Sequence, residues 1–207
     1  MKRIAGLSCV LVVALFATGC AKLVLKHAPL TPSAQAAGSV GLVVRDVREE
    51  EFGGGDELYV GRLRNMYGMP IKFKADNSMT EALTALYTDA LAAAGYQVVA
   101  GSPTQIQVDV KMFFMDGYMG YKIDSSFDVL VVSGGGASFK APIEEGHGFA
   151  YMRNADMYAA FDQIMDKIAA AAVTLFNTAE FRAAVAGQAA PPEAALTAPA
   201  APPAAPQ

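Results

Sequence analysis

The chain has 207 residues, which suits one domain with tails, and 53% of them are apolar. Its formal net charge is −4, so it has no electrostatic reason to bind nucleic acid. The one unbroken apolar run, residues 4–16, is shorter than the roughly 20 residues that cross a bilayer, and no membrane-spanning helix is expected.

The first 19 residues have the layout of a secretory signal peptide. Lys2 and Arg3 precede the apolar run, and three small residues follow it. The sequence Ala17-Thr18-Gly19-Cys20 resembles the lipobox of bacterial lipoproteins, in which the cysteine is alkylated by a diacylglyceryl group and becomes the new N-terminus. The alternative is an ordinary signal peptide followed by a chance cysteine. At about 0.8 kcal/mol per buried methylene, two or three fatty chains such as palmitate would anchor the protein essentially permanently.

Cleavage before Cys20 would leave a mature chain with no free thiol, because the other cysteine, Cys9, lies in the leader. It would also lower Lys plus Arg from 16 to 14 against 20 acidic residues, a net charge of −6. The covalent lipid on Cys20, and not a basic patch, is therefore expected to attach the protein to the membrane.

Residues 20–38 mix Pro, Ala, Ser and Thr with little periodicity, and they are predicted to be the acylated N-terminus and a tether. The folded domain is predicted to cover residues 39–186. Its first strand is predicted at residues 39–48, where β-branched residues dominate. A polar loop follows, and residues 58–63 and 70–74 are predicted to pair as a small hairpin.

Ser78 and Glu81 have the spacing of a capping box, and apolar residues then recur at three- and four-residue steps, which predicts a helix ending at Gly95. Residues 105–112, 121–132 and 138–152 show the alternation of a three-stranded antiparallel meander. The side chains expected to face the core from the first of these strands are Ile106, Val108, Val110 and Met112.

A final helix is predicted at residues 156–186, and a second cap spacing at Asn177 and Glu180 indicates a break within it. Residues 187–207 consist mostly of Ala and Pro and are predicted to be a disordered tail. The order strand, helix, three-stranded meander, helix predicts an α+β fold. We expect a mostly antiparallel sheet with two helices packed on one face.

A search for catalytic, cofactor-binding and metal-binding residues predicts none. His27 lies in the predicted tether, where nothing is expected to hold it. His147 follows two glutamates, but the ligand-rich spacing of a metal site is absent, so a polar hairpin edge is favoured. The acidic run at residues 49–51 matches no calcium-binding loop.

Three carboxylates, Asp109, Asp124 and Asp128, are predicted to share the polar face of the sheet. Paired carboxylates can do acid–base work, and the alternative is a plain solvated face. Methionine and aromatic side chains crowd the turn that follows residue 112. Because methionine suits adaptable contact surfaces, Phe114, Tyr118 and Met119 are a candidate partner surface, with core filling as the alternative.

The chain resembles the YajG family of bacterial lipoproteins in residues 41–44, 94–98, 106–110, 121–132 and 176–181, and in the lipobox followed by Ala21-Lys22. The likeness spans most of residues 20–185 and rests on order and spacing. The glycines at 53–55 and the Ala/Pro tail depart from it. The resemblance implies a lipoprotein on the periplasmic face of the outer membrane, since Ala21 is not the Asp of an inner-membrane retention signal. It carries over no catalytic or binding residue.

These features predict a non-enzymatic, lipid-anchored envelope lipoprotein that acts as an adaptor or accessory protein through an envelope protein partner. A fainter resemblance, to auxiliary lipoproteins of ABC-type lipid transporters, implies an alternative, a subunit that binds lipid or another small ligand for an envelope transport system. A groove between the helices and the sheet would favour that alternative, and a solid interior would oppose it. An enzyme is the third and least favoured class.

Overall fold

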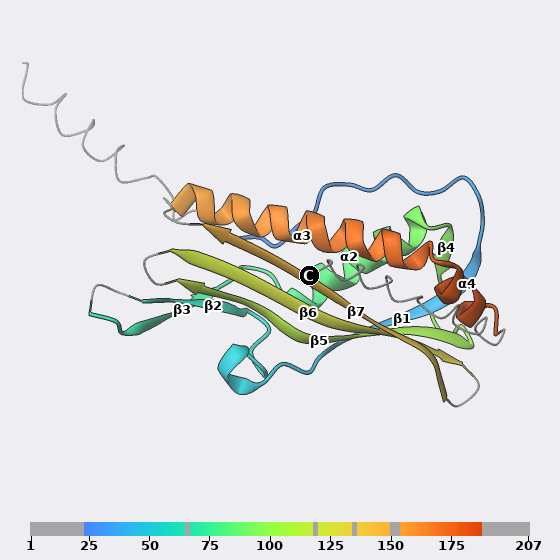
Figure 1. The fold of residues 1–207 in the computed structure, drawn as a ribbon, viewed down its shortest axis with the longest axis horizontal. Coiled ribbons are helices and arrows are strands. Elements are labelled where there is room, and N and C mark those ends of the chain that lie inside the picture. Colours follow the sequence, from blue (N-terminus) through green and yellow to red (C-terminus); the bar gives the residue numbers. More distant parts are fainter. Residues whose placement is uncertain (1–22, 65–66, 118–119, 134–135, 150–153, 188–207) are drawn as a thin grey trace, which may run out of the picture.

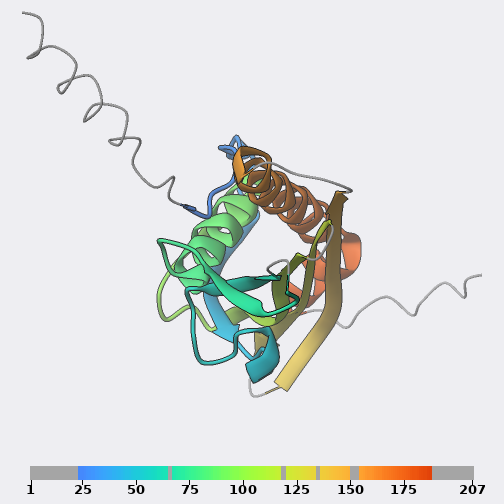
Figure 2. The same cartoon turned by 90° about the vertical axis from the view of Figure 1, so that its left-hand side faces the viewer.

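The computed structural model describes residues 23–64, 67–117, 120–133, 136–149 and 154–187. The predicted signal peptide, Cys20 and residues 188–207 of the predicted tail lie outside these ranges. The described residues form an α+β fold in which helices lie along one side of a curled mixed sheet (Figure 1; Figure 2).

Strand β5 (Thr104–Gly117) is the centre of the sheet. It is long enough for β1 (Gly38–Asp46) and β2 (Tyr59–Arg64) to pair with it in succession along one edge, and both pairings are parallel. Antiparallel β6 (Tyr121–Ser133) and then β7 (Gly136–Phe149) follow on the other edge. Two short strands complete the sheet, with β4 (Tyr96–Val98) parallel to β1 and β3 (Pro70–Lys74) antiparallel to β2.

The expectation of a mostly antiparallel sheet is therefore wrong, although the predicted meander is present as β5, β6 and β7. Alternation along a strand reports one polar face but not the direction of the neighbouring strand. Helix α2 (Met79–Ala93) returns the chain to the beginning of β1, so β4 and β5 run parallel to β1 on its two sides. Such a crossover connection is what a parallel pair requires.

A β-bulge in β5 changes which of its side chains face the core. The pairing of β5 with β6 shifts between Val110 and Met112. Val110 is fully buried as predicted, but Met112, which was predicted to be buried, is only half-buried. Phe113 and Met115 take the core positions beyond the bulge. The predicted alternation is therefore right up to Val110 and one residue out of step after it.

The predicted helix ends are largely confirmed. The Ser78 hydroxyl accepts a hydrogen bond from the Glu81 amide (3.2 Å), and Gly95 follows α2 with a φ of 92°. The C-terminal helical segment breaks into α3 (Asn154–Phe176) and α4 (Ala179–Val185), and Thr178 caps α4 in place of Asn177. No single helix in the described residues is long and apolar enough to cross a membrane. Helices α3 and α4 would be so only together, and they are bent by 70°.

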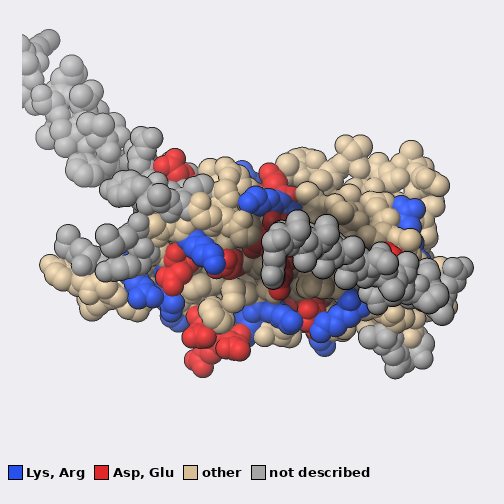
Figure 3. Space-filling model, in the orientation of Figure 1, with Lys and Arg blue, Asp and Glu red and all other residues tan. Residues whose placement is uncertain are grey.

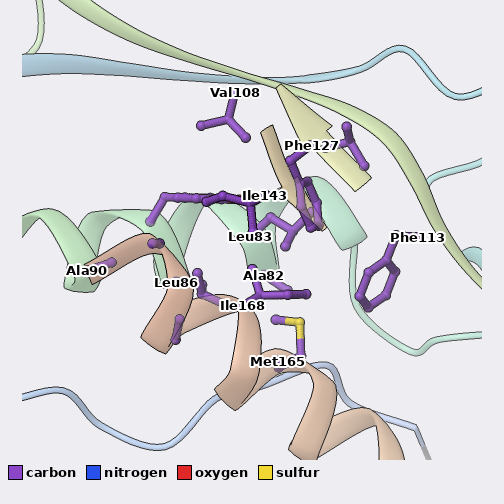
Figure 4. Packing of buried hydrophobic residues seen from close by; sticks show 14 of the residues in the cluster. Ala82, Leu83, Leu86, Ala90, Val108, Phe113, Phe127, Ile143, Met165 and Ile168 are labelled. Atoms are coloured by element: carbon purple, nitrogen blue, oxygen red, sulfur yellow. The ribbon is translucent and has the colours of Figure 1, made fainter. Parts of the chain in front are cut away.

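The core lies between α2, α3 and the sheet. Leu83 of α2, Phe127 of β6, Ile143 of β7 and Met165 of α3 meet there (Figure 4). Each is at most 4% exposed. Burial of a side chain of this size contributes about 1.5–3 kcal/mol, so this layer supplies much of the stability of the fold.

Candidate functional site

Residues 23–37, named here the N-terminal strap, pass along α2 and α3 before β1 begins (Figure 1; Figure 2). Leu23 and Leu25 point into the fold and are each 3% exposed, whereas Val24 between them is exposed. These residues therefore belong to the folded domain, where a tether was predicted. The position of Leu23 bears on function because Cys20, the predicted lipidation site, lies only three residues before it.

The strap is held by hydrogen bonds along its length. The Asn77 side chain, just before α2, accepts from the Leu25 amide (2.8 Å) and donates to the Leu25 carbonyl (3.0 Å). The Leu23 carbonyl accepts from the Asp76 amide at 2.7 Å. Farther along, the Ala28 amide donates to Asp166 of α3 (2.6 Å), and the Ser33 amide donates to the last turn of α2 (3.0 Å). Contacts to both helices fix the path of the strap.

His27 is part of this attachment, although it was predicted to lie unsupported in a tether. Its side chain is 8% exposed, and its Nε2 lies 3.6 Å from Asp89 of α2. The two border a shallow hollow between the strap and α2, together with Glu81. In the described part of the chain, however, no three His, Cys, Asp or Glu residues are arranged to hold a metal ion. The contact between His27 and Asp89 is better explained as attachment of the strap to α2 than as a metal site.

Phe114 does not belong to an exposed surface. It is 4% exposed, and its ring makes edge-to-face contacts with Phe52 and Tyr59, both with centroids 5.6 Å away. The bulge in β5 turns Phe114 to the outer face, where the loop after β1 and strand β2 cover it. Tyr118 and Met119, the other members of the candidate partner surface, lie outside the described residues. Phe114 is therefore buried beneath this loop and strand, and it is not part of an exposed partner surface.

Arg48 organises the loop that covers Phe114, and sequence reasoning missed it. Its side chain is fully buried and pairs with Asp46, with both nitrogen–oxygen distances at 2.9 Å. The same guanidinium donates to the carbonyl oxygens of Phe52, Gly53 and Tyr59 at 2.9–3.0 Å. One five-donor group thus bonds a carboxylate and three backbone carbonyls of residues 52–59. An arginine at the end of a strand gives no local signal of this role.

The three carboxylates considered for acid–base work are each held in ion pairs. Asp109 forms a bidentate ion pair with Arg45 (2.7 and 2.8 Å), and Asp124 lies 2.9 Å from Lys122. Asp128 pairs with Lys111 of β5 at 2.7 Å and with Lys140 of β7 at 3.0 Å. Burial alone would raise the pKa of Asp128, but these two hydrogen-bonded lysines outweigh it and hold the pKa below its usual value. A carboxylate with a lowered pKa is a weak general base.

The second histidine, His147, lies on β7 beside α3. Its Nδ1 is 3.5 Å from the Lys167 ammonium, which also donates to the Gly146 carbonyl (2.9 Å). Burial lowers the pKa of His147, and the charge of Lys167 lowers it further. A lysine at this distance would repel a metal cation. The acidic run at residues 49–51 likewise borders a shallow hollow that contains Lys72.

Together, the fold and the strap define an α+β domain whose N-terminal segment is fastened across its helices. No family model matches the chain, and no curated protein is similar to it in sequence. Among solved structures, protein XCC0632 from Xanthomonas campestris, of family DUF330, is 15% identical with a TM-score of 0.54, over 73% of this chain and 90% of its own. At this identity the likeness shows a shared fold alone.

Two further solved structures are more distant. An uncharacterised protein is 11% identical with a TM-score of 0.48, over 73% of this chain and 98% of its own. A candidate lipoprotein from Caulobacter crescentus CB15 is 18% identical with a TM-score of 0.36, over 51% of this chain and 82% of its own. At these TM-scores neither carries an argument. The resemblance to the YajG family is not confirmed by these comparisons.

Proposed function

We propose that this chain is a lipid-anchored lipoprotein on the periplasmic face of the outer membrane, acting through protein contacts and without catalysis. One observation carries the proposal. The predicted lipobox ends at Cys20, three residues before Leu23, which is the first described residue and is already buried. A lipid on Cys20 would therefore lie next to the described domain, with only Ala21 and Lys22 between them.

The packing of the interior bears on the choice between an adaptor and a lipid-binding subunit. Between α2, α3 and the sheet, where a groove for an apolar ligand was considered, side chains of both helices and of the sheet pack against one another (Figure 4). Phe113, Phe127 and Phe161 are fully buried there. Ligand pockets for apolar molecules are usually largely formed in advance. This packing supports function through surface contacts.

Metabolic labelling with radioactive palmitate tests the anchor. The wild-type protein should be labelled, and the Cys20→Ala variant should lose both the label and its place in the membrane fraction. Cys9→Ala is the matched control, because this cysteine lies in the leader and its loss should leave the label unchanged. Equal labelling and membrane retention of the Cys20→Ala variant would refute the proposal. Separation of inner and outer membranes by density then tests the assignment to the outer membrane.

Crosslinking in intact cells, followed by mass spectrometry, tests the function through protein contacts. A specific envelope protein should be recovered with the wild type and lost with the mislocalised Cys20→Ala variant. Recovery of lipid without any protein would instead favour the lipid-binding alternative.

A further inference from the structure

The hairpin of β2 and β3 exposes apolar side chains at its end. Tyr67 is 80% exposed, Met69 is 59% exposed and Ile71 is 53% exposed. Only eight large apolar side chains are exposed among the described residues, and three of them lie within residues 67–71. The hairpin also projects farther than the other described elements at its end of the molecule (Figure 1). A cluster of this kind marks a surface that meets a partner or a membrane.

Charged side chains of both signs lie behind this apolar end. Residues 58–75 contain four Lys and Arg and no acidic residue, in a chain that is acidic as a whole. Arg64 is opposite Pro70 in the hairpin, and Arg62 is opposite Lys72. Both arginines also pair with Asp116 of β5, at 3.6 and 2.8 Å. Blue and red side chains both lie next to the tan end of the hairpin in Figure 3. The acidic run at residues 49–51 borders the same hollow as Tyr59 and Lys72, so acidic side chains lie beside these cations.

The position of the strap connects this hairpin with the anchor. The Leu23 carbonyl accepts from the amide of Asp76, two residues after β3 ends, so the strap enters beside the base of the hairpin. Three residues of extended chain reach at most about 11 Å, which limits the distance from Leu23 to Cys20. A lipid on Cys20 would therefore hold this end of the domain against the bilayer.

We propose that the end of the β2–β3 hairpin inserts into the lipid surface next to the anchor. The inference rests on the lipid anchor proposed above. The apolar side chains occupy the boundary between headgroups and acyl chains, and the charged side chains behind them lie at the level of the headgroups. This is the order in which interfacial segments place apolar, aromatic and basic side chains. The hairpin then orients the domain, and the acyl chains supply most of the affinity.

A single tryptophan tests the contact, because the chain contains none. The experiment uses the protein with its native N-terminus, purified from membranes and reconstituted in vesicles of phosphatidylethanolamine and phosphatidylglycerol. In the Tyr67→Trp variant the emission should shift to shorter wavelength, and brominated lipids should quench it. Bromine near the carbonyl end of the chains should quench more strongly than bromine near the methyl end, because interfacial segments insert only about 5–10 Å.

Val99→Trp is the matched control. Val99 is also an exposed apolar residue, at 40%, and it follows β4 at the opposite end of the domain (Figure 1). Its tryptophan should be neither shifted nor quenched. Equal quenching at the two positions, or none at either, would overturn the inference. So would a signal at position 67 that changes only with protein concentration, which would indicate a second copy. Palmitate labelling of the same preparation separates the two proposals, since an unquenched tryptophan in labelled protein counts against the hairpin alone.

Discussion

The attachment of the strap through Asn77 gives the sharpest prediction. Replacing Asn77 by Ala removes the acceptor for the Leu25 amide and the donor to the Leu25 carbonyl. Each hydrogen bond of this kind contributes about 1 kcal/mol net. We therefore expect the Asn77→Ala variant to weaken docking of the strap by about 2 kcal/mol. A change of about 1.4 kcal/mol alters a population tenfold, so the detached form should become about 30-fold more abundant.

Limited trypsin digestion measures this population. The bond after Lys26 lies within the strap and can be cleaved only when the strap detaches, and its cleavage rate follows the detached population when reattachment is fast. Mass spectrometry identifies the cleaved bond. Asn177→Ala is the matched control, because Asn177 also makes two hydrogen bonds, to Val173 and Arg182, and neither partner belongs to the strap. If both variants are cleaved after Lys26 at the wild-type rate, the strap is not held as described.

Four further predictions concern stability, each measured by urea unfolding. Phe114→Ser should lower the free energy of unfolding by about 3 kcal/mol because the ring is buried. An unchanged free energy would indicate that Phe114 is a surface residue after all. Arg48→Met should lower the free energy of unfolding by about 3–5 kcal/mol, because Asp46 and several backbone carbonyls lose their buried partner. A decrease below 1 kcal/mol would contradict this role of Arg48. Tyr87→Phe should raise stability by about 1 kcal/mol, because the buried hydroxyl has no hydrogen-bond partner within the described residues, and a loss would reveal a hidden one. The hydrogen bond from Arg62 of β2 holds the pKa of Asp116 below its usual value of 3.8. This ion pair therefore stabilises the fold fully above pH 3.8, and the stabilisation is lost as the pH falls through the lower pKa that Asp116 has in the folded protein. The stability gap between wild type and Asp116→Asn should therefore close below about pH 4, and a constant gap would exclude the ion pair as its cause.

Local patterns predicted most of the helices and strands. The alternation in β5 and β6, the cap at Ser78 and the glycine after α2 each reflect forces that act within a few residues, and each is confirmed. The direction of the strands could not be read in the same way. It depends on pairing between residues such as Arg45 and Asp109, which are 64 positions apart. The bulge near Met112 was missed because one extra residue leaves the composition of the strand unchanged.

The candidate site was less accessible from the sequence. Leu23 and Leu25 alternate with exposed neighbours, but two apolar residues in a proline-containing stretch give no reliable period. Arg48 carried no signal, because the carbonyls that it satisfies come from a loop whose path the sequence does not specify. Phe114 was assigned to a surface on composition alone, since the side chains that cover it, Phe52 and Tyr59, lie more than fifty residues earlier.

The strap changes what an anchor on Cys20 would do. A flexible tether of the predicted 19 residues would let the domain turn freely, with an end-to-end distance of about 25 Å. The ordered strap leaves only two residues between Cys20 and Leu23, which allow at most about 11 Å. An anchor this short restricts orientation as well as position, so one end of the domain would face the bilayer and the opposite end, with β4, would face the periplasm (Figure 1). A protein partner approaching from the periplasm would then meet the same surface on every copy, and this is the property that an adaptor requires.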